Sequence, residues 1–375
     1  MDDKERYIQD ATLRFELLLR KQLDRQEKMA AGGDAGKYFP GNKTVIGLID
    51  GDGIGPMIMR SAKTVLEKLL ADEIACGKIE LREIPGLTIE NRRALGVSVP
   101  ADVLSAIKAC DVLLKGPTET PKGGTLESAN VTLRRELDLY ANIRPVFVPE
   151  KGIDWMFFRE NTEGEYILGS SGISVPGELA FDFKVTTVAG TERIARAAFD
   201  YARANGKKNV AIVTKANIMK KTDGLFSEIA HKVAADYPEI TAEDWYIDIM
   251  CANLVNEAIR TRFEVFLLPN LYGDIITDEA AQIQGGVGTA GSGNIGDRYA
   301  MFEAVHGTAP RLIEEGLGDY ANPCSILTAT VMMLRHIGLP KKAAILATAL
   351  DEKQHLINGT REGLTTEAFT KALLP

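Results

Sequence analysis

Short apolar runs alternate with segments of helical spacing along most of this chain. The runs are rich in Val, Ile, Leu and Phe, and turn-forming residues bound several of them, as is typical of strands. Between them, apolar residues recur as on the buried face of a helix. The alternation predicts an α/β fold with parallel strands. Strands are expected at 45–49, 79–84, 111–114, 155–158, 181–188, 210–213 and 265–268, and helices at 56–71, 101–110, 191–204, 223–235 and 325–336.

Residues 1–30 differ from the rest, because they are charged and favour a helix with little apolar content. Ile8, Leu13, Leu17 and Leu18 lie near helical spacing, and the glycines of segment 31–36 are expected to end the helix. A surface helix or an oligomer contact is the expected use of this extension.

Composition narrows the class of protein. The chain has 375 residues, of which 45% are hydrophobic and 26% charged, enough for two core-forming units. The net charge of -8, without a long basic run, argues against nucleic acid as a partner. No apolar run approaches the roughly 18 residues of a membrane span. The first residues lack the apolar region of a secretory signal, and the four cysteines are widely spaced, so a cytoplasmic protein with reduced thiols is expected.

Three arginines supply the strongest chemical signal. Arg134, Arg144 and Arg159 each stand beside apolar, strand- or helix-like sequence, where a guanidinium needs an anion. A small substrate with more than one carboxylate would satisfy them. Ser128 and Asn130 precede Arg134, and at a helix start Ser128 could help to hold an anion or simply cap the helix.

Asp274 and Asp278 have the i, i+4 spacing that places two side chains on one face of a helix beginning near Gly273. Their oxygens suit Mg²⁺ or Mn²⁺, and Asp248 could add a third ligand. The more common use of such a pair is a helix cap with a first-turn acid, and Asp248 could be a solvated acid.

Two further segments carry candidate chemistry. Tyr166 and Lys215 could move protons, although a core tyrosine and a surface lysine are the plainer uses of such residues. The glycine-rich segment 285–296 could approach a ligand closely, with His306 stacking on or bonding to an adenine; a flexible loop is the alternative.

Segment 51–56 reads Gly-Asp-Gly-Ile-Gly-Pro after a strand and invites a dinucleotide-binding interpretation. The third glycine of G-x-G-x-x-G is missing, and no acidic residue ends the next strand where it would bind a ribose. A tight turn beneath a ligand cleft is the better prediction. No Walker-type lysine is present in this segment, which argues against a kinase-like protein.

Together these segments resemble the isocitrate/isopropylmalate dehydrogenase family, in order from about Val45 to about Gly338. The resemblance implies an α/β fold of that family's own type, not a Rossmann fold. It implies a large α/β domain with the cofactor site from residues 41–139 and 286–375. A small domain with dimer contacts would comprise 140–285, and a helical extension 1–40 would precede both. It also implies a homodimer whose subunits share active sites.

The resemblance assigns a role to each candidate residue. Ser128, Asn130, Arg134, Arg144 and Arg159 would hold the substrate carboxylates. Tyr166 and Lys215 would transfer protons, with Lys215 reaching into the partner's site. Asp274 and Asp278, with Asp248 from the partner, would bind Mg²⁺ or Mn²⁺. The cofactor would contact Thr120, Gly288, Asn294, His306, Gly307, Thr308, Ala309, Arg311 and Asn322.

The expected reaction is the oxidative decarboxylation of isocitrate to 2-oxoglutarate and CO₂. Isopropylmalate enzymes place an apolar residue where this chain has Asn130, and polar groups reject an alkyl substituent. Isopropylmalate, homoisocitrate and tartrate remain alternative substrates, and a non-catalytic regulatory subunit is a further alternative. Arg311 favours the 2′-phosphate of NADP, but Glu314 and Glu315 oppose it, so NAD is preferred and NADP is the close alternative.

Overall fold

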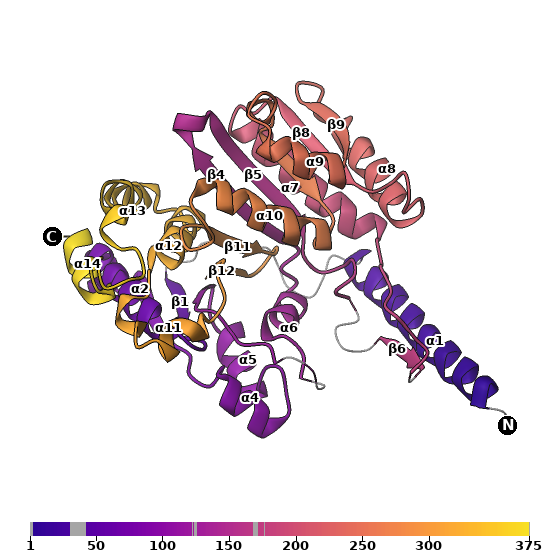
Figure 1. Cartoon of the computed structure of the whole chain (residues 1–375), viewed down its shortest axis with the longest axis horizontal. Coiled ribbons are helices and arrows are strands. Elements are labelled where there is room, and N and C mark those ends of the chain that lie inside the picture. Colours follow the sequence, from indigo (N-terminus) through magenta and orange to yellow (C-terminus); the bar gives the residue numbers. More distant parts are fainter. Residues whose placement is uncertain are drawn as a thin grey trace.

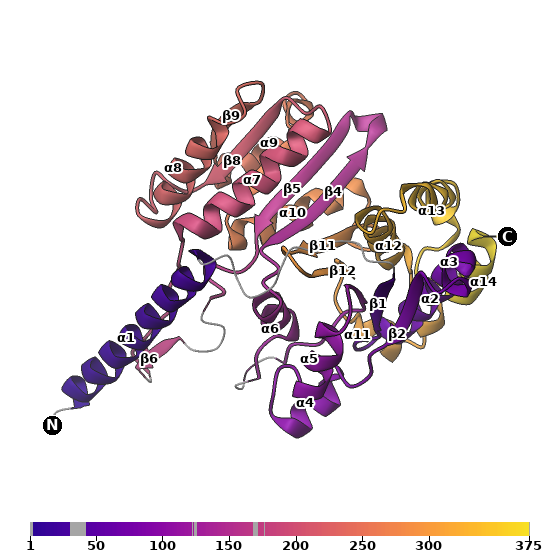
Figure 2. The same cartoon turned by 180° about the vertical axis from the view of Figure 1, so that it is seen from behind.

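The computed structural model describes residues 3–30, 43–121, 123, 126–167, 172–175 and 177–374. A sheet of ten strands runs through the molecule, and helices cover both of its faces (Figures 1 and 2). The main helices are α1 (Asp3–Ala30), α2 (Gly55–Leu69), α3 (Ala71–Ala75), α4 (Ile89–Leu95), α5 (Ala101–Lys108), α6 (Ala129–Glu136), α7 (Val188–Ala204), α8 (Thr222–Ala234), α9 (Ile247–Val255), α10 (Asn270–Gln284), α11 (Pro310–Glu314), α12 (Cys324–His336), α13 (Pro340–Lys353) and α14 (Thr366–Leu373).

The ten strands of the sheet follow the order β2-β1-β3-β12-β11-β4-β5-β10-β8-β9. They are β1 (Thr44–Ile49), β2 (Ile79–Glu83), β3 (Val112–Lys115), β4 (Ala141–Val148), β5 (Ile153–Glu160), β8 (Asn209–Thr214), β9 (Thr241–Tyr246), β10 (Val265–Leu268), β11 (Gly291–Ile295) and β12 (Ala300–Ala304); β6 (Ile173–Val175) and β7 (Leu179–Phe181) form a separate hairpin.

The α/β fold is confirmed, and the outer strands of the sheet are parallel as expected, but the centre of the sheet is not. Strand β4 is antiparallel to both β5 and β11, and β11 is antiparallel to β12. The cause is the length of two connections, 149–152 between β4 and β5 and 296–299 between β11 and β12. Parallel neighbours need a crossover of about a dozen residues or more, whereas a short turn reverses the chain.

Three local expectations also need correction. Segment 181–188 is not a strand beyond Phe181, the last residue of β7. Thr187 accepts a hydrogen bond from the Gly190 amide (3.0 Å) and starts α7 at Val188. Part of the glycine-rich segment 285–296 forms β11, because β4 and β12 supply backbone partners on both sides. Helix α10 begins at Asn270 rather than near Gly273. The expected helix end at 31–36 lies outside the described residues.

Each half of the sheet has its own apolar packing. Buried clusters around Leu66 and Leu113 draw on residues 46–139 and on residues from 300 onward. Clusters around Phe199 and Phe266 draw on residues 141–280, with α7 on one face of the sheet and α10 on the other. The boundaries 1–40, 41–139 with 286–375, and 140–285 stay a prediction.

Helix α1 is the outlying element of the molecule. Its 28 residues project from the body beside β6 and the start of α7 (Figure 2). The ring of Phe15 lies 5.5 Å from that of Phe183, between centroids. None of the described helices is both long and apolar enough to cross a membrane.

Candidate functional site

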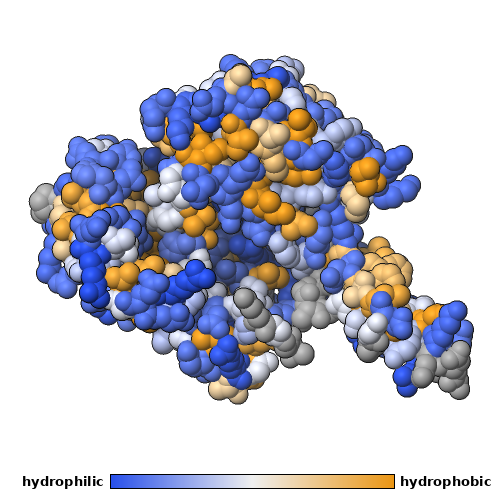
Figure 3. All heavy atoms as spheres, in the orientation of Figure 1, coloured by the Kyte–Doolittle hydropathy of each residue, from blue (hydrophilic) through white to orange (hydrophobic). Residues whose placement is uncertain are grey.

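A pocket of about 520 Å³ lies between the two halves of the sheet, and Figure 3 shows the hollow from one side. Helix α6, the loop after β3, strands β4 and β5, the end of β12 and helix α10 supply its walls. The predicted site residues on its lining are Thr120, Ser128, Asn130, Arg134, Arg144, Arg159, Tyr166, Asp274, His306 and Gly307. Residues far apart in the chain are therefore brought together as expected.

Two of the arginines project from neighbouring strands. Arg159 of β5 is 1% exposed and donates from Nε (3.0 Å) and Nη2 (2.7 Å) to Asn270 Oδ1. Arg144 of β4 donates from Nη1 to Thr277 Oγ1 at 2.6 Å. Burial and the charge of Arg134 lower the pKa of Arg159 to about 9, so it is still charged at neutral pH and needs an anion.

Arg134 reaches the pocket from α6. Its Nη2 lies 3.3 Å from Glu303 Oε1, while its Nε is buried and has no hydrogen-bond partner among the described residues. An unpaired buried donor costs free energy unless a ligand accepts from it. Arg134 therefore offers a free donor to a bound carboxylate.

Asp274 and Asp278 lie on one face of α10 and pair with the arginines. Asp274 pairs with Arg159 and lies 3.7 Å from Arg144 Nη2, while Asp278 Oδ1 lies 2.9 Å from Arg144 Nη1. Burial opposes ionisation of Asp274, but the charges of Arg159 and Arg144 outweigh it, so its pKa is lowered. Asp274 is thus an ionised acceptor for a cation, and Asp278 lies beside it on the same face of α10.

The predicted third metal ligand, Asp248, is elsewhere. It lies in the first turn of α9, and its Oδ1 is 2.6 Å from Lys215 Nζ at the end of β8. Neither residue lines the pocket of its own chain. The sequence places both in the site of a partner subunit, and that assignment stays a prediction. Among the described residues of one chain, no group of three or more His, Cys, Asp or Glu could hold a metal ion. Asp274 and Asp278 fit a divalent cation as two oxygen ligands of an incomplete set.

Tyr166 points its hydroxyl at the same carboxylate, and Oη donates to Asp274 Oδ2 at 2.9 Å. Burial, and then the negative charge of Asp274, raise the pKa of Tyr166 to about 12. The phenol therefore keeps its proton at neutral pH and can serve as a proton donor beside the pocket.

Helix α6 begins at Ala129, and Ser128 is its N-cap residue. The Ser128 side chain makes no capping hydrogen bond, so its hydroxyl remains available on the pocket wall. Asn130 Oδ1 accepts from Thr118 Oγ1 at 3.0 Å, which leaves the amide nitrogen of Asn130 as a donor. The expectation that Ser128 stands at a helix start is confirmed.

The cofactor candidates are only partly on the pocket lining. His306 Nδ1 lies 2.9 Å from the Gly307 carbonyl, and its buried Nε2 has no partner among the described residues. Burial lowers the pKa of His306, which favours a neutral ring at pH 7. Thr308 and Ala309 lead into α11, where Arg311 is exposed.

Three other cofactor candidates do not line the pocket. Gly288 lies in the turn before β11, and Asn322 Oδ1 accepts from the Cys324 amide at 2.9 Å, at the start of α12. Asn294 is fully buried in the sheet, and its assignment to the cofactor stays a prediction. Its Oδ1 accepts from Asn142 (2.9 Å) and Asn161 (3.0 Å), so the surrounding side chains occupy it.

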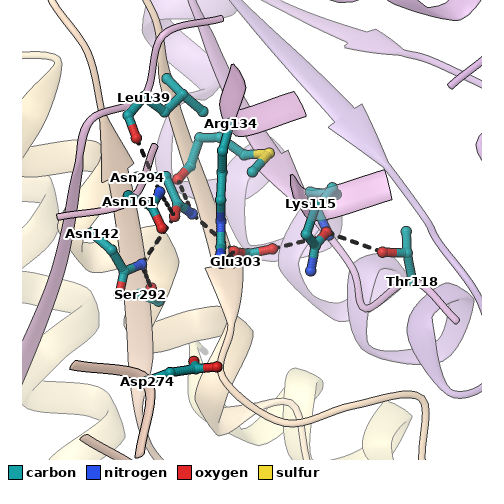
Figure 4. Close-up of polar contacts among 12 residues, drawn as sticks. Lys115, Thr118, Arg134, Leu139, Asn142, Asn161, Asp274, Ser292, Asn294 and Glu303 are labelled. Atoms are coloured by element: carbon teal, nitrogen blue, oxygen red, sulfur yellow. Dashed lines mark hydrogen bonds and ion pairs between the residues drawn. The ribbon is translucent and has the colours of Figure 1, made fainter. Parts of the chain in front are cut away.

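Asn294 belongs to a buried network that the sequence analysis missed (Figure 4). Its Nδ2 donates to Glu303 Oε1 at 2.8 Å, and Glu303 Oε2 lies 3.0 Å from Lys115 Nζ. Burial alone would raise the pKa of Glu303, but Lys115 and Arg134 outweigh it and hold the pKa at about 2. A charged residue within the apolar stretch 302–305, and a lysine ending an apolar strand, were the available signals.

The glycine turn before α2 is a tight turn beneath the pocket, as predicted. Gly51 and Gly53 have φ angles of 74° and 61°, and side chains there would collide with the carbonyls of Pro117 and Thr308. Asp52 between them accepts from the Ile89 amide at 2.7 Å. The turn therefore fixes two loops that border the site.

Fold and pocket together define an α/β protein whose pocket gathers three guanidinium groups beside the aspartates of α10. The model of the isocitrate/isopropylmalate dehydrogenase family matches residues 45–372, and the chain belongs to this family. The match begins after α1.

Individual relatives agree with this assignment. A Caenorhabditis elegans protein named as a probable mitochondrial NAD isocitrate dehydrogenase subunit alpha is 40% identical, over 85% of this chain and 87% of its own. The NADP isocitrate dehydrogenase of Rickettsia prowazekii is 39% identical, over 82% of this chain and 62% of its own. The crystal structure of isocitrate dehydrogenase from Methylococcus capsulatus superposes with a TM-score of 0.78 at 36% identity, covering 88% of this chain and 98% of that one.

Proposed function

We propose that this protein oxidises and decarboxylates isocitrate to 2-oxoglutarate and CO₂, with NAD as the hydride acceptor and Mg²⁺ or Mn²⁺ as the metal. The observation that carries the proposal is the convergence of Arg134, Arg144 and Arg159 on one pocket. Isocitrate has three carboxylates, and a guanidinium binds a carboxylate through two parallel hydrogen bonds. The names of relatives at about 40% identity support the same substrate.

The position of each residue around the pocket determines its proposed role in the reaction. The arginines bind and orient the substrate carboxylates, and Ser128 and Asn130 face them from α6. Tyr166 holds its proton at Oη beside Asp274 and delivers it to the carbon from which CO₂ has left. A divalent cation at Asp274 and Asp278 would supply positive charge for the oxygen that becomes negative.

Lys215 and Asp248 act, in this proposal, in the pocket of a second copy. They form a pair outside their own pocket, and neither has another role in the site of its own chain. A homodimer with shared sites would complete both the metal ligands and the proton-transfer pair. A heteromeric assembly is the alternative, since the worm relative is named as one subunit.

NAD is preferred to NADP because Glu314 and Glu315 are exposed close to Arg311 on and after α11. Their charge would repel a 2′-phosphate that Arg311 attracts. The Rickettsia relative is named for NADP, and NADP remains the close alternative. Isopropylmalate is disfavoured by Asn130, which offers amide groups where an alkyl group would leave them unpaired.

The test is to mix purified protein with isocitrate, isopropylmalate, homoisocitrate or tartrate, each with NAD or NADP and Mg²⁺, and to follow absorbance of the reduced cofactor. We expect the highest kcat/KM with isocitrate and NAD. A higher kcat/KM with another acid would replace isocitrate. If the protein turns over none of the four acids, the regulatory-subunit alternative is supported.

A further inference from the structure

Helix α1 lies outside the residues that match the family, yet its second half reaches the body of the protein. Arg25 Nη1 lies 2.8 Å from Glu163 Oε1, and Nη2 donates to Thr162 Oγ1 at 2.9 Å. The Glu163 side chain is only 3% exposed and that of Arg25 is 23% exposed. Arg25 thus contacts a buried carboxylate with one nitrogen and a neighbouring hydroxyl with the other, unlike the solvated pairs elsewhere on α1.

Glu163 is held at the start of α7. Its carboxylate accepts from the Thr187 amide at 2.9 Å and from the Thr187 hydroxyl. Gly190 makes room for it, because a side chain at that position would collide with the carboxylate. In the part of the chain that the structure describes, no other Lys or Arg lies within ion-pair distance of Glu163.

The same segment supports Arg159. The Glu163 carbonyl accepts from Asn270 Nδ2 at 2.9 Å. Asn270 Oδ1 in turn accepts two bonds from Arg159, at 3.0 and 2.7 Å. Arg159 itself is only four positions before Glu163, at the end of β5. A shift of Glu163 would therefore move both the Arg159 backbone and the amide that aims its guanidinium.

A second route leads from the segment to Arg134. Asn161 Nδ2 donates to Asn294 Oδ1 at 3.0 Å, and Asn294 donates to Glu303, which pairs with Arg134. Residues 160–163 thus lie between Arg25 and the supports of two pocket arginines. Arg25 touches none of the pocket lining directly.

We infer that Arg25 is a positioning residue that holds segment 160–163 so that Arg159 and Arg134 are presented to the substrate carboxylates. Helix α1 is, in this view, a structural part of the substrate site. The inference rests on the proposed function for the identity of the substrate. Without Arg25, the buried Glu163 carboxylate loses its cation next to a second buried carboxylate, Glu160, and the segment must rearrange.

The test compares Arg25→Ala with Arg20→Ala in the full-length protein. Arg20 is the matched control, because it lies on the same helix and pairs with Glu16 in solvent, with a side chain 70% exposed. For Arg25→Ala we expect the KM for isocitrate to rise about tenfold, equivalent to about 1.4 kcal/mol. We expect kcat to stay within about twofold, because an arginine that orients substrate acts on binding. The KM for NAD should not change, and Arg20→Ala should behave as wild type.

Arg25→Lys should recover part of the loss, because lysine can pair with Glu163 but lacks the fork that also reaches Thr162. A second measurement is the rise in Tm caused by isocitrate with Mg²⁺ in the absence of NAD, which should be smaller for Arg25→Ala. This readout needs no turnover. If Arg25→Ala does not fold, Arg25→Lys and Arg25→Gln carry the same comparison.

An unchanged KM for isocitrate in Arg25→Ala would overturn the inference, as would equal losses for isocitrate and NAD. The substrate assay on the wild-type protein tests the proposed function independently of Arg25. If wild type turns over another of the four hydroxy acids, the proposed substrate is wrong and the same KM comparison with that acid still tests Arg25.

Discussion

The cluster around Glu303 and the cluster around Asp274 both pair buried guanidinium or ammonium groups with carboxylates, but the carboxylates of the second are far more exposed to solvent. The Glu303 side chain is 7% exposed and Lys115 is fully enclosed, whereas Asp274 is 40% and Asp278 59% exposed. An enclosed pair cannot exchange partners without a large free-energy cost. The open carboxylates can accept a cation from solvent, which would free Arg144 and Arg159 for an incoming anion. The Lys115–Glu303 pair is suited to hold the structure, and the Asp274 cluster to bind ligands.

The largest effect should come from breaking the enclosed cluster. Glu303→Gln leaves Lys115 buried without its counter-charge and should reduce the free energy of unfolding by about 3–5 kcal/mol. Chemical denaturation measures it, with exposed Glu315→Gln as the control. A loss below that of the control would show that the enclosed cluster is not structural.

The same cluster predicts a pH dependence. The folded-state pKa of Glu303 is about 2, below its ordinary 4.5, so its contribution to stability is complete above 4.5 and is lost as pH falls towards 2. The difference in stability between wild type and Glu303→Gln should therefore shrink over that range. A constant difference from pH 6 to pH 3 would contradict the assignment.

Breaking the open cluster should affect turnover and leave folding intact. Asp274→Asn removes one charge from the proposed cation site and should lower kcat by about a hundredfold or more. The exposed Asp351→Asn is the matched control. Wild-type activity should also disappear in excess chelator and return with Mg²⁺ or Mn²⁺. Full activity without a divalent cation would disprove the proposed site.

A substitution at Asn130 tests how the open pocket selects its substrate. Asn130→Leu replaces amide groups on the pocket wall with an alkyl surface, and a lost hydrogen bond to a charged group costs about 1.5–3 kcal/mol. The kcat/KM for isocitrate should fall about ten- to a hundredfold, and any turnover of isopropylmalate should rise. Unchanged isocitrate kinetics would remove Asn130 from the specificity residues.

Co-assembly tests whether the Lys215–Asp248 pair completes a neighbour's pocket. Lys215→Met and Arg134→Ala should each be inactive, because each damages a different part of a shared site. Random mixing of subunits should restore about a quarter of wild-type activity, since half of the dimers would be mixed and would hold one intact site each. Mixed dimers without recovered activity would argue that each chain works alone.

The smallest expected effect concerns the choice of cofactor. Arg311→Asp should preserve or improve the kcat/KM for NAD, because aspartate can accept hydrogen bonds from the ribose hydroxyls. The ratio of kcat/KM for NAD and NADP in wild type and variant measures the choice. A wild-type preference for NADP that Arg311→Asp abolishes would make Arg311 the phosphate-binding residue.

Local patterns in the sequence predicted several helices and strands and the pocket arginines, because burial and periodicity are reflected in neighbouring residues. The antiparallel centre was missed, since it depends on which strands lie beside each other. Pairing of Lys115 with Glu303, and of Arg25 with Glu163, was also missed, because the partners are 188 and 138 residues apart by number. Spacing along the chain carries no sign of such contacts. The burial of Asn294 could not be predicted for the same reason, because its partners are distant in the sequence.

The antiparallel strands at the centre of the sheet also constrain how the protein can open. Strands β4 and β11 pair at Ile143 with Gly293 and at Asn142 with Asn294, so backbone hydrogen bonds cross directly from one half of the molecule to the other. If the two halves separated about a hinge between β4 and β11, the hydrogen bonds between these strands would break. If the two strands bent together, the hydrogen bonds would be kept. Amide protons along this seam should therefore exchange with deuterated solvent as slowly as those of the innermost strands, even while the pocket fills and empties.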